Sequence, residues 1–432
     1  MVLYASVPMK IAVDLTPMRP GGENGGVKLA IIEFLKGLKK HLGDELQYLF
    51  FTSDDTHDET ASLLGVNDSA FCVLRRSGRG NLVRTFDLAT RSRLAARNLM
   101  RQHRVDVLYH PFGTIFFASE RIPSVAMIVD TLHRDFPYSL PAQTIEWREL
   151  QFRKLVDSVD YFQVISQFTA ERVKSLYKLP PDRIFVTHLP IHGRLTFQSA
   201  KREPFFFYPA NFWVHKNHEA LLVAYQIYLA KSAGIMPWKL VFTGHLDERA
   251  RFLQKTAADL GIAAHVKFSG HVPENELAKL YSTASCLVFP SLHEGFGIPI
   301  VEAMSFGLPV ICGNDTSIPE IAGDAAFYTE TRNPTKLADA LLAVAGDEAL
   351  RAKLAALGRE RLKTFDFSIE VERLANVFAA AVRTSPVFRR KRRVLRNFLF
   401  SAAYYARALA PKALNRRSIR VSSGSMAKDR RR

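Results

Sequence analysis

Short apolar runs alternate along the first half of the chain with longer segments in which apolar residues recur every three or four positions. The runs indicate buried strands, and the longer period indicates helices that pack by one face. Strands are predicted over residues 10–15, 48–52, 105–110, 125–130 and 161–165, and helices over 27–42, 88–103 and 143–157. This alternation is typical of a parallel α/β sheet.

A second alternating series begins after residue 203. Strands are predicted over residues 205–209, 239–243, 266–269, 286–290 and 309–312, and helices over 217–233, 248–260, 274–285 and 299–306. A further helical stretch is predicted over 336–380. The two series favour an α/β fold with two Rossmann-like, doubly wound domains, which bind ligands at the carboxyl ends of their strands.

The length of 432 residues agrees with two domains, because a single hydrophobic core rarely grows beyond about 250–300 residues. We expect an N-terminal domain over 1–195, a C-terminal domain over 196–385 and a basic helical tail over 386–432. The hinge is expected near 192–203, a polar segment with no strong period.

Most of the net charge of +17 lies in the tail. Residues 389–432 carry 15 Lys and Arg against the single acid Asp429, a net +14, so the remaining 388 residues carry +3. Apolar side chains at helical spacing accompany this charge, at Leu395, Phe398, Leu399, Ala402, Tyr405 and Leu409. A helix of this kind can lie in an anionic membrane interface, so we expect peripheral binding to the inner face of the plasma membrane.

Other features favour a cytoplasmic protein. Cys72, Cys286 and Cys312 are few and far apart, which is typical of a reduced compartment and of buried thiols. Residues 1–8 are interpreted as a short extension rather than a signal peptide, because a strand follows them directly. The chain has no run of about 20 apolar residues, so no transmembrane helix is predicted.

The segment from His293 to Glu302 carries Glu294 and Glu302 on either side of a glycine-rich turn that leads into a predicted helix. Such a turn frees backbone N–H groups, and a helix N-terminus favours the negative charge of a phosphate. Two glutamates at this spacing also occur on ordinary surfaces, but here a buried strand ends just before Glu294. The segment therefore indicates a site for a phosphorylated, polyhydroxylated ligand.

Residues 286–311 resemble the E-x7-E region of the family 4 glycosyltransferases almost continuously. The resemblance covers roughly residues 9–380 and implies the GT-B fold, in which two Rossmann-like domains face each other across a cleft that binds a nucleotide sugar. It implies that Glu302 binds the donor ribose and that Glu294 binds hydroxyls of the transferred sugar. The backbone would approach the sugar and the diphosphate at Phe296, Gly297 and Ile298.

Lys216 lies where the second domain's first strand leads into its first helix. A cation there stabilises the charge that grows on a leaving diphosphate, although a lone lysine at a helix start is more often only solvated. Family 4 enzymes usually have an arginine five residues earlier, where this chain has Asn211, which can donate only a neutral hydrogen bond. His215 and His218 are three residues apart, but no third ligand has matching spacing, so no metal site is predicted.

The resemblance is looser in the first domain. Gly25 and Gly26 end a glycine-rich loop that matches the family's first-domain loop, so both are expected to lie beside the donor. Asp130 matches the acid of a His-Asp motif and is expected to be catalytic, but Val129 replaces the histidine. His133 is a candidate substitute for that histidine; otherwise it is expected to be an exposed loop residue.

Two further matches have structural explanations. Ser166, between a strand and a helix, is expected to be a helix N-cap, and Glu320 is expected to be structural. The chain has no Asp-x-Asp motif, with which the other large glycosyltransferase fold holds its metal. We therefore expect a metal-independent enzyme without a cofactor.

The resemblance implies a glycosyltransferase that moves a hexose, with retention, from a nucleoside diphosphate sugar to an acceptor hydroxyl. Mannose from GDP-mannose is the favoured donor, and a lipid-linked or cell-surface glycan is the favoured acceptor. One alternative is another nucleotide-sugar enzyme of the same fold, such as an epimerase. A second is a non-catalytic protein that binds nucleic acid through its basic tail. This alternative is disfavoured because no RNA-binding motif with base-stacking aromatics occurs.

Overall fold

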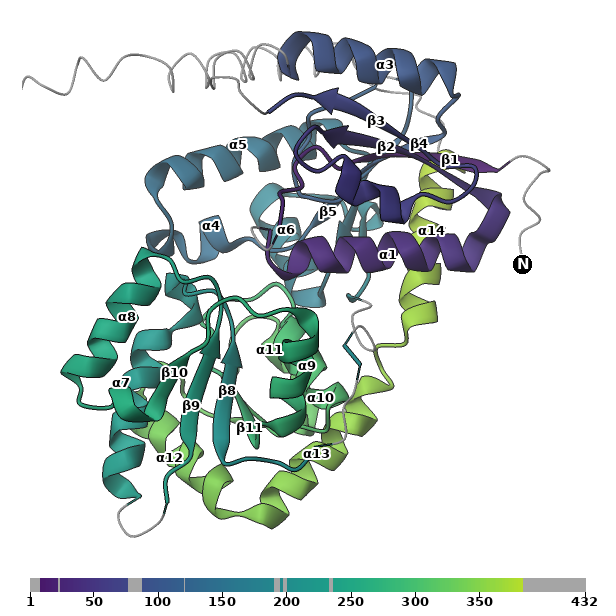
Figure 1. The fold of residues 1–432 in the computed structure, drawn as a ribbon. Helices are drawn as coiled ribbons and strands as arrows, with labels where there is room; N and C mark the ends of the chain where they lie inside the picture. The colour runs from purple at the N-terminus through teal and green to yellow at the C-terminus, as the bar shows by residue number, and fades with distance from the viewer. Residues whose placement is uncertain are drawn as a thin grey trace, which may run out of the picture.

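The computed structural model describes residues 8–21, 24–76, 88–119, 121–189, 195–196, 200–232 and 236–383. This part of the chain forms two parallel β-sheets, each covered by helices. The two sheets with their helices lie one above the other in Figure 1. The α/β fold with two Rossmann-like domains is therefore confirmed. The predicted tail lies outside the described residues.

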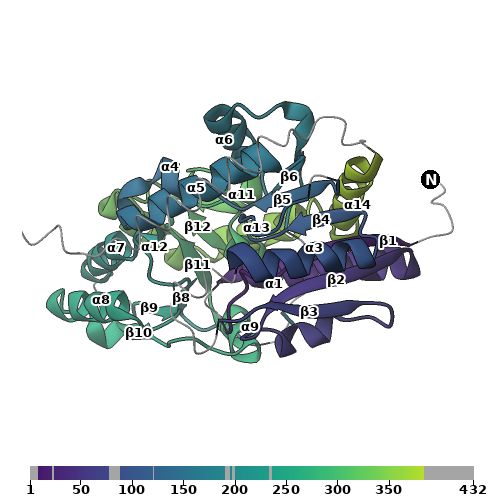
Figure 2. The same ribbon diagram turned by 90° about the horizontal axis from the view of Figure 1, so that it is seen from above.

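The first sheet has the strand order β3-β2-β1-β4-β5-β6-β7. Its strands are β1 (Met9–Asp14), β2 (Leu46–Ser53), β3 (Ser69–Leu74), β4 (Val107–His110), β5 (Ser124–Ile128), β6 (Tyr161–Val164) and β7 (Ile184–Val186). Its helices are α1 (Gly26–Leu42), α3 (Arg93–Gln102), α4 (Leu132–Asp135), α5 (Ala142–Ser158) and α6 (Gln167–Tyr177). Helices α3 and α5 lie on one side of the sheet and α1 on the other (Figures 1 and 2).

The second sheet has the order β10-β9-β8-β11-β12-β13. Its strands are β8 (Phe205–Pro209), β9 (Lys239–Thr243), β10 (Val266–Phe268), β11 (Cys286–Phe289), β12 (Val310–Cys312) and β13 (Ala326–Tyr328). The helices that follow in the chain are α7 (His218–Lys231), α8 (Glu248–Asp259), α9 (Glu274–Thr283), α10 (Ile298–Ser305), α11 (Ile318–Ala322), α12 (Pro334–Gly346), α13 (Glu348–Leu362) and α14 (Phe367–Arg383). The strand order reverses between β8 and β11, where doubly wound sheets bind their ligands.

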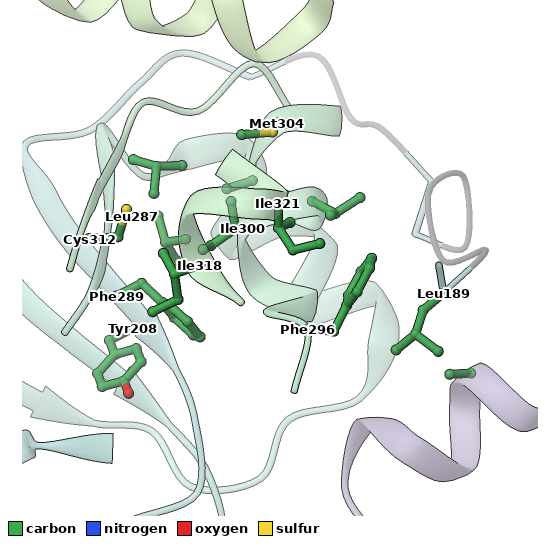
Figure 3. Close-up of a cluster of buried hydrophobic side chains, with 14 of the residues drawn as sticks. Leu189, Tyr208, Leu287, Phe289, Phe296, Ile300, Met304, Cys312, Ile318 and Ile321 are labelled. Carbon is green, nitrogen blue, oxygen red and sulfur yellow. The ribbon is translucent and has the colours of Figure 1, made fainter. Parts of the chain in front are cut away.

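The central strands of the second sheet are buried on both faces, which explains their continuous apolar sequence. All four residues of β11 are buried, and Ile300 and Met304 of α10 lie over this strand (Figure 3). Cys286 and Cys312 are buried on β11 and β12, as expected. Cys72 is exposed on the edge strand β3, so the expectation of a buried thiol was wrong for this residue.

Every strand predicted from an apolar run is present, with ends shifted by a few residues at most. The sequence did not predict β3, a half-exposed edge strand, or the three-residue strands β7 and β13. The stretch predicted as helical over 336–380 is three helices. Asp347 caps α13 and Asp366 accepts hydrogen bonds from the first turn of α14, so the chain restarts a helix at each of them.

The last described helix differs from the expected division into domains. Helix α14 follows the second domain in sequence, yet it packs against α1 and against strands β4, β5 and β6 of the first sheet (Figure 1). The Phe378 ring meets the Tyr109 ring edge-on, with centroids 5.1 Å apart. A Cβ atom on Gly37 of α1 would lie 2.6 Å from the Phe367 ring, so the two helices cross closely. The C-terminal domain was expected to run to residue 385, and α14 lies within that range although it packs against the first sheet.

No helix within the described ranges is long and apolar enough to cross a membrane.

Candidate active site

Two glycine turns bring the domains into direct contact at the carboxyl ends of their strands. A Cβ atom on Gly295 would lie 1.7 Å from the carbonyl oxygen of Val129, and one on Gly26 would lie 2.7 Å from Cδ1 of Ile298. Gly25 faces the Trp213 ring, which a Cβ atom would meet at 3.8 Å. The first-domain loop at Gly25 and Gly26 therefore lies beside the loop that leads into α10.

The loop from β11 to α10 is held by side chains that follow β12. The Glu294 amide donates to Oγ1 of Thr316 at 3.1 Å, and Oγ of Ser317 donates to the carbonyl oxygens of Glu294 and Phe296, each at 3.0 Å. Thr316 adopts a φ of 58°, which costs a β-branched residue on the order of 1–3 kcal/mol. Backbone strain of this kind is concentrated at functional sites, where surrounding contacts maintain it.

Lys216 and Glu294 form an ion pair between the loops that follow β8 and β11. The Lys216 Nζ atom lies 2.5 Å from Oε1 of Glu294, and each side chain is 13% exposed. Burial raises the pKa of the Glu294 carboxyl, but the charges of Lys216 and His215 outweigh burial and hold the pKa below its ordinary value. The pair therefore places one cation and one ionised carboxylate together at the switch point of the second sheet.

Glu302 lies on α10 and is 5% exposed. Its Oε2 atom accepts a hydrogen bond of 2.7 Å from the hydroxyl of Tyr281 on α9. Gly297 caps the N-terminus of α10 with a φ of 114°, a conformation that glycine adopts readily. The Phe296 side chain packs against His188 and Phe365, with ring centroids 5.9 and 6.0 Å away.

The loop after β8 is tied to the loop after β9. The Asn211 Oδ1 atom accepts a hydrogen bond of 3.0 Å from the backbone N–H of His245. His218 is buried among aromatic rings, with its centroid 4.7 Å from that of Tyr208 and 4.9 Å from that of Phe212. Burial lowers the pKa of His215 to about 4. Among the residues with described positions, no three His, Cys, Asp or Glu side chains are grouped to hold a metal.

Asp130 lies at the start of α4, where its Oδ1 atom accepts hydrogen bonds from the Leu132 amide, at 2.9 Å, and from the Arg148 guanidinium. Burial raises the pKa of Asp130, but the charges of Arg148 and His293 outweigh burial and lower it. Asp130 is therefore an ionised carboxylate that helps to hold α4 against α5.

His133 does not take the place of the histidine that Val129 replaces. It is buried on the side of α4 that faces α5 and α6, with its Nε2 atom 3.1 Å from the Tyr177 hydroxyl and its ring centroid 4.6 Å from that of Phe152. Burial lowers the pKa of His133 to about 4. Both interpretations of His133 were therefore wrong, since the residue is neither at the cleft nor an exposed loop residue.

The comparisons with protein families identify the chain. The model described as "Glycosyltransferase Family 4" matches residues 24–192, and the model "Glycosyl transferases group 1" matches residues 195–361. The chain belongs to the family 4 glycosyltransferases. The recognition from the E-x7-E segment is thus confirmed, and so is the assignment of the chain as a glycosyltransferase enzyme.

This glycosyltransferase is similar to bacterial O-antigen enzymes. It is 27% identical to O-antigen chain mannosyltransferase B of Escherichia coli over 61% of this chain and 71% of the relative. It is 27% identical to O-antigen chain mannosyltransferase RfbU of Salmonella typhimurium over 48% of this chain and 58% of the relative. It is 34% identical to the serotype-specific mannosyltransferase WbdA of Escherichia coli, over 38% of this chain but only 18% of that relative.

Solved structures show the same fold. The sucrose-phosphate synthase of Thermosynechococcus elongatus matches with a TM-score of 0.69 at 17% identity, over 87% of this chain and all of that one. WaaG, a glycosyltransferase involved in lipopolysaccharide biosynthesis, matches with a TM-score of 0.59 at 15% identity, over 85% of this chain and 99% of that one. The two domains of this glycosyltransferase thus form the GT-B fold.

Glu320 and His188 connect the two domains of this glycosyltransferase. Glu320 accepts hydrogen bonds from the amides of Gln167 and Phe168, at 2.7 and 3.0 Å, and so caps α6 from the opposite domain. His188 lies 3.0 Å from Glu320 and 3.4 Å from Glu370 of α14. Burial lowers the pKa of His188, but the two carboxylates outweigh burial and raise it to about 9.

Ser166 and Glu320 have the structural roles that were predicted for them. Ser166 caps α6 through a hydrogen bond that its Oγ atom accepts from the Thr169 amide at 3.1 Å. Glu320 is structural, but in a way that sequence reasoning missed, because its partners Gln167 and Phe168 are about 150 residues away in the chain. His188 carried no sequence signal at all, since neither of its carboxylate partners is near it in the sequence.

Proposed function

We propose that this glycosyltransferase transfers mannose from a nucleoside diphosphate sugar, with GDP-mannose as the favoured donor, to a hydroxyl of a growing glycan. The O-antigen mannosyltransferases among its relatives support the sugar and the glycan acceptor. The observation that carries the proposal is the ion pair of Lys216 and Glu294 beside the N-terminus of α10. It combines a cation, a carboxylate and a helix N-terminus, which together suit a sugar diphosphate.

In the proposed site, the second domain holds the donor. Glu302 accepts hydrogen bonds from the ribose hydroxyls, and Glu294 accepts them from the sugar. The diphosphate lies at the glycine turn of Phe296, Gly297 and Ile298, where the dipole of α10 favours negative charge. The first domain binds the acceptor and closes the cleft with the loop of Gly25 and Gly26. The contact of Gly26 with Ile298 supports this division of the site.

The proposed reaction keeps the anomeric configuration without a metal or a cofactor. The bond from the sugar carbon to the leaving phosphate oxygen breaks while the acceptor oxygen bonds to the same face of that carbon. The acceptor proton moves to the leaving phosphate. Lys216, with Asn211 as a neutral donor nearby, stabilises the growing negative charge. Asp130 keeps α4 in place on the acceptor side through Arg148 and the Leu132 amide.

Replacing Glu302 by glutamine tests the donor site. The change keeps the volume of the side chain and its acceptor for Tyr281, but it removes the charge from hydrogen bonds that are each worth about 1.5–3 kcal/mol. We expect transfer from GDP-mannose to fall about 10- to 100-fold, measured as glycosylated acceptor. The matched control is Tyr281→Phe, which removes the hydrogen bond to Glu302 without touching the proposed ligand.

Full transfer by the Glu302→Gln protein would show that the ribose is bound elsewhere. The assay is repeated with UDP-glucose and ADP-glucose, which tests the nucleotide separately from the transfer reaction. Consumption of donor with no glycosylated product from any of the three would instead favour an epimerase or another enzyme that acts on the nucleotide sugar alone.

The same proposal includes binding to the cytoplasmic face of a membrane through the basic tail. Residues 389–432 carry a net charge of +14, and each basic residue near an anionic surface contributes about 1 kcal/mol. We expect the full chain to float with phosphatidylserine-containing vesicles in 0.15 M salt and not with neutral vesicles. Retention on RNA rather than on the anionic vesicles would favour a nucleic-acid partner instead.

A further inference from the structure

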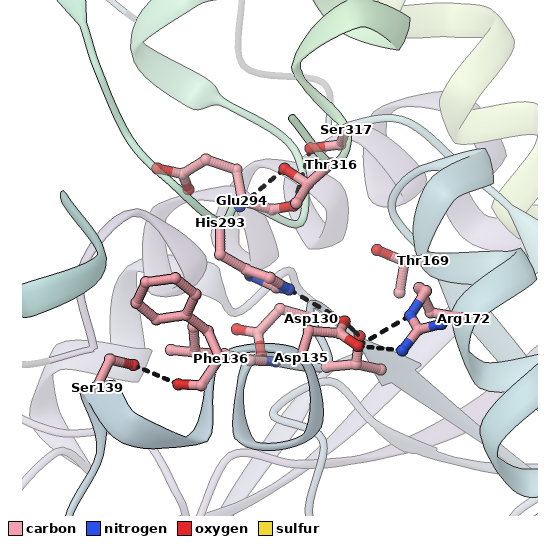
Figure 4. A network of polar contacts seen from close by, with 12 residues as sticks. Asp130, Asp135, Phe136, Ser139, Thr169, Arg172, His293, Glu294, Thr316 and Ser317 are labelled. Atoms are coloured by element: carbon pink, nitrogen blue, oxygen red, sulfur yellow. Dashed lines mark hydrogen bonds and ion pairs between the residues drawn. The ribbon is translucent and has the colours of Figure 1, made fainter. Parts of the chain in front are cut away.

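Asp135 and His293 connect the two domains beside the proposed donor site. The Nε2 atom of His293 lies 3.2 Å from Oδ2 of Asp135, although the two residues are 158 positions apart in the chain (Figure 4). His293 is 3% exposed and belongs to the loop of the second domain, whereas Asp135 ends helix α4 of the first domain. Neither residue was singled out from the sequence.

The first domain holds the Asp135 carboxylate in place on its own. Arg172 of α6 donates to Oδ1 through its Nε atom at 2.9 Å, and the hydroxyl of Thr131 donates to Oδ2. Burial raises the pKa of Asp135, but the hydrogen bonds from His293, Arg172 and Thr131 outweigh burial and hold it well below its ordinary range. Asp135 is therefore a fixed, charged acceptor. Of these three partners, Arg172 and Thr131 belong to the first domain and His293 belongs to the second.

His293 precedes Glu294 in the same loop, and the two side chains point to different domains. Glu294 pairs with Lys216 of the second domain. His293 reaches Asp135 of the first domain (Figure 4). The next residue, Gly295, meets the Val129 carbonyl of the first domain. The hydrogen bond of His293 therefore fixes the loop of Glu294 relative to the acceptor-side domain.

We propose that Asp135 and His293 are positioning residues for transfer, and that their hydrogen bond holds the Glu294 loop against the first domain when the cleft closes. The inference rests on the proposed function, because it assigns the donor to the second domain and the acceptor to the first. Donor binding needs only the second domain, whereas transfer needs the two domains to be held in the correct relative position. The pair therefore acts on turnover and not on nucleotide affinity.

Replacing His293 by alanine is the test. We expect kcat to fall about tenfold, as for the loss of one charge-assisted hydrogen bond, while the dissociation constants of GDP and UDP stay within a factor of about two. His293→Gln is expected to restore most of the turnover, because the glutamine Nε2 can donate to Asp135 in place of the imidazole Nε2. His271→Ala, at an exposed histidine of the second domain, is the matched control and should leave kcat unchanged.

Small-angle X-ray scattering gives a readout that does not depend on transfer. With saturating GDP or UDP, the wild-type and His293→Gln proteins should reach the same radius of gyration, and the His293→Ala protein should stay more extended. Wild-type kcat in the His293→Ala protein, or a loss of nucleotide affinity equal to the loss of kcat, would overturn the inference. If the wild type makes no glycosylated product from any donor, the proposed function fails, and the scattering result still decides whether the pair closes the cleft.

Discussion

Replacing Lys216 by methionine is expected to slow sugar transfer about 10²- to 10³-fold, as for the loss of one preorganised group that stabilises transition-state charge. Methionine keeps the apolar stem of the lysine side chain but removes the ammonium that lies 2.5 Å from Glu294. The effect should appear mainly in kcat, because the charge on the leaving diphosphate grows only as the glycosidic bond breaks. Steady-state measurement of glycosylated acceptor checks this.

The same change should alter the response of the protein to acid. Glu294 has a lowered pKa, so its ionisation adds to the free energy of unfolding above its ordinary pKa of 4.5, and this contribution is lost as the pH falls toward the pKa of the folded protein. Without Lys216, the largest influence that lowers the pKa of Glu294 is lost, so burial moves this pKa upward. We therefore expect the acid-unfolding midpoint of Lys216→Met, followed by tryptophan fluorescence, to lie at higher pH than that of the wild type.

Lys231 offers a matched control in the same domain. It forms an ion pair of 2.7 Å with Asp339, but the two side chains are 45% and 50% exposed, and exposed pairs contribute about 0–1 kcal/mol. Lys231→Met should leave both transfer and acid unfolding close to those of the wild type. Wild-type turnover in the Lys216→Met protein would remove Lys216 from the proposed mechanism.

The strands and the donor-side motif could be predicted because both are local in sequence. A buried parallel strand such as β11 is a continuous apolar run, and the turn from Glu294 to Glu302 is bounded by such a run and a helix. A few neighbouring residues are therefore enough to predict that such a strand is buried. Most residues of β3, β7 and β13 are only partly buried, and these three strands were missed.

Contacts between distant parts of the chain could not be predicted from local patterns. The apolar face of α14 would suit either sheet, and nothing in its sequence says that it returns to the first one. His133 lies near Val129 in sequence, but the turn of α4 directs it toward Tyr177 and away from the cleft. His293 reaches the first domain instead, and only the fold brings it to Asp135.

Replacing Gly295 by alanine is expected to reduce transfer at least about 10²-fold, since misplacing reacting groups by about 1 Å has an effect of that size. The added Cβ atom would lie 1.7 Å from the Val129 carbonyl oxygen and 2.8 Å from its carbon, and a backbone carbonyl cannot rotate away as a flexible side chain can. Gly295 is not among the glycines with positive φ, so alanine suits the loop itself. The clash therefore acts on the contact between the domains and not on the folding of the second domain.

This distinction sets the measurements. The Gly295→Ala protein should keep the thermal stabilisation by GDP or UDP that the wild type shows, but its radius of gyration with nucleotide should be larger. Gly346→Ala is the matched control, because a Cβ atom there meets nothing within 4 Å. Full transfer by Gly295→Ala would mean that the reaction does not need the contact of Gly295 with Val129, and that the loop of Glu294 acts at a greater distance from the first domain.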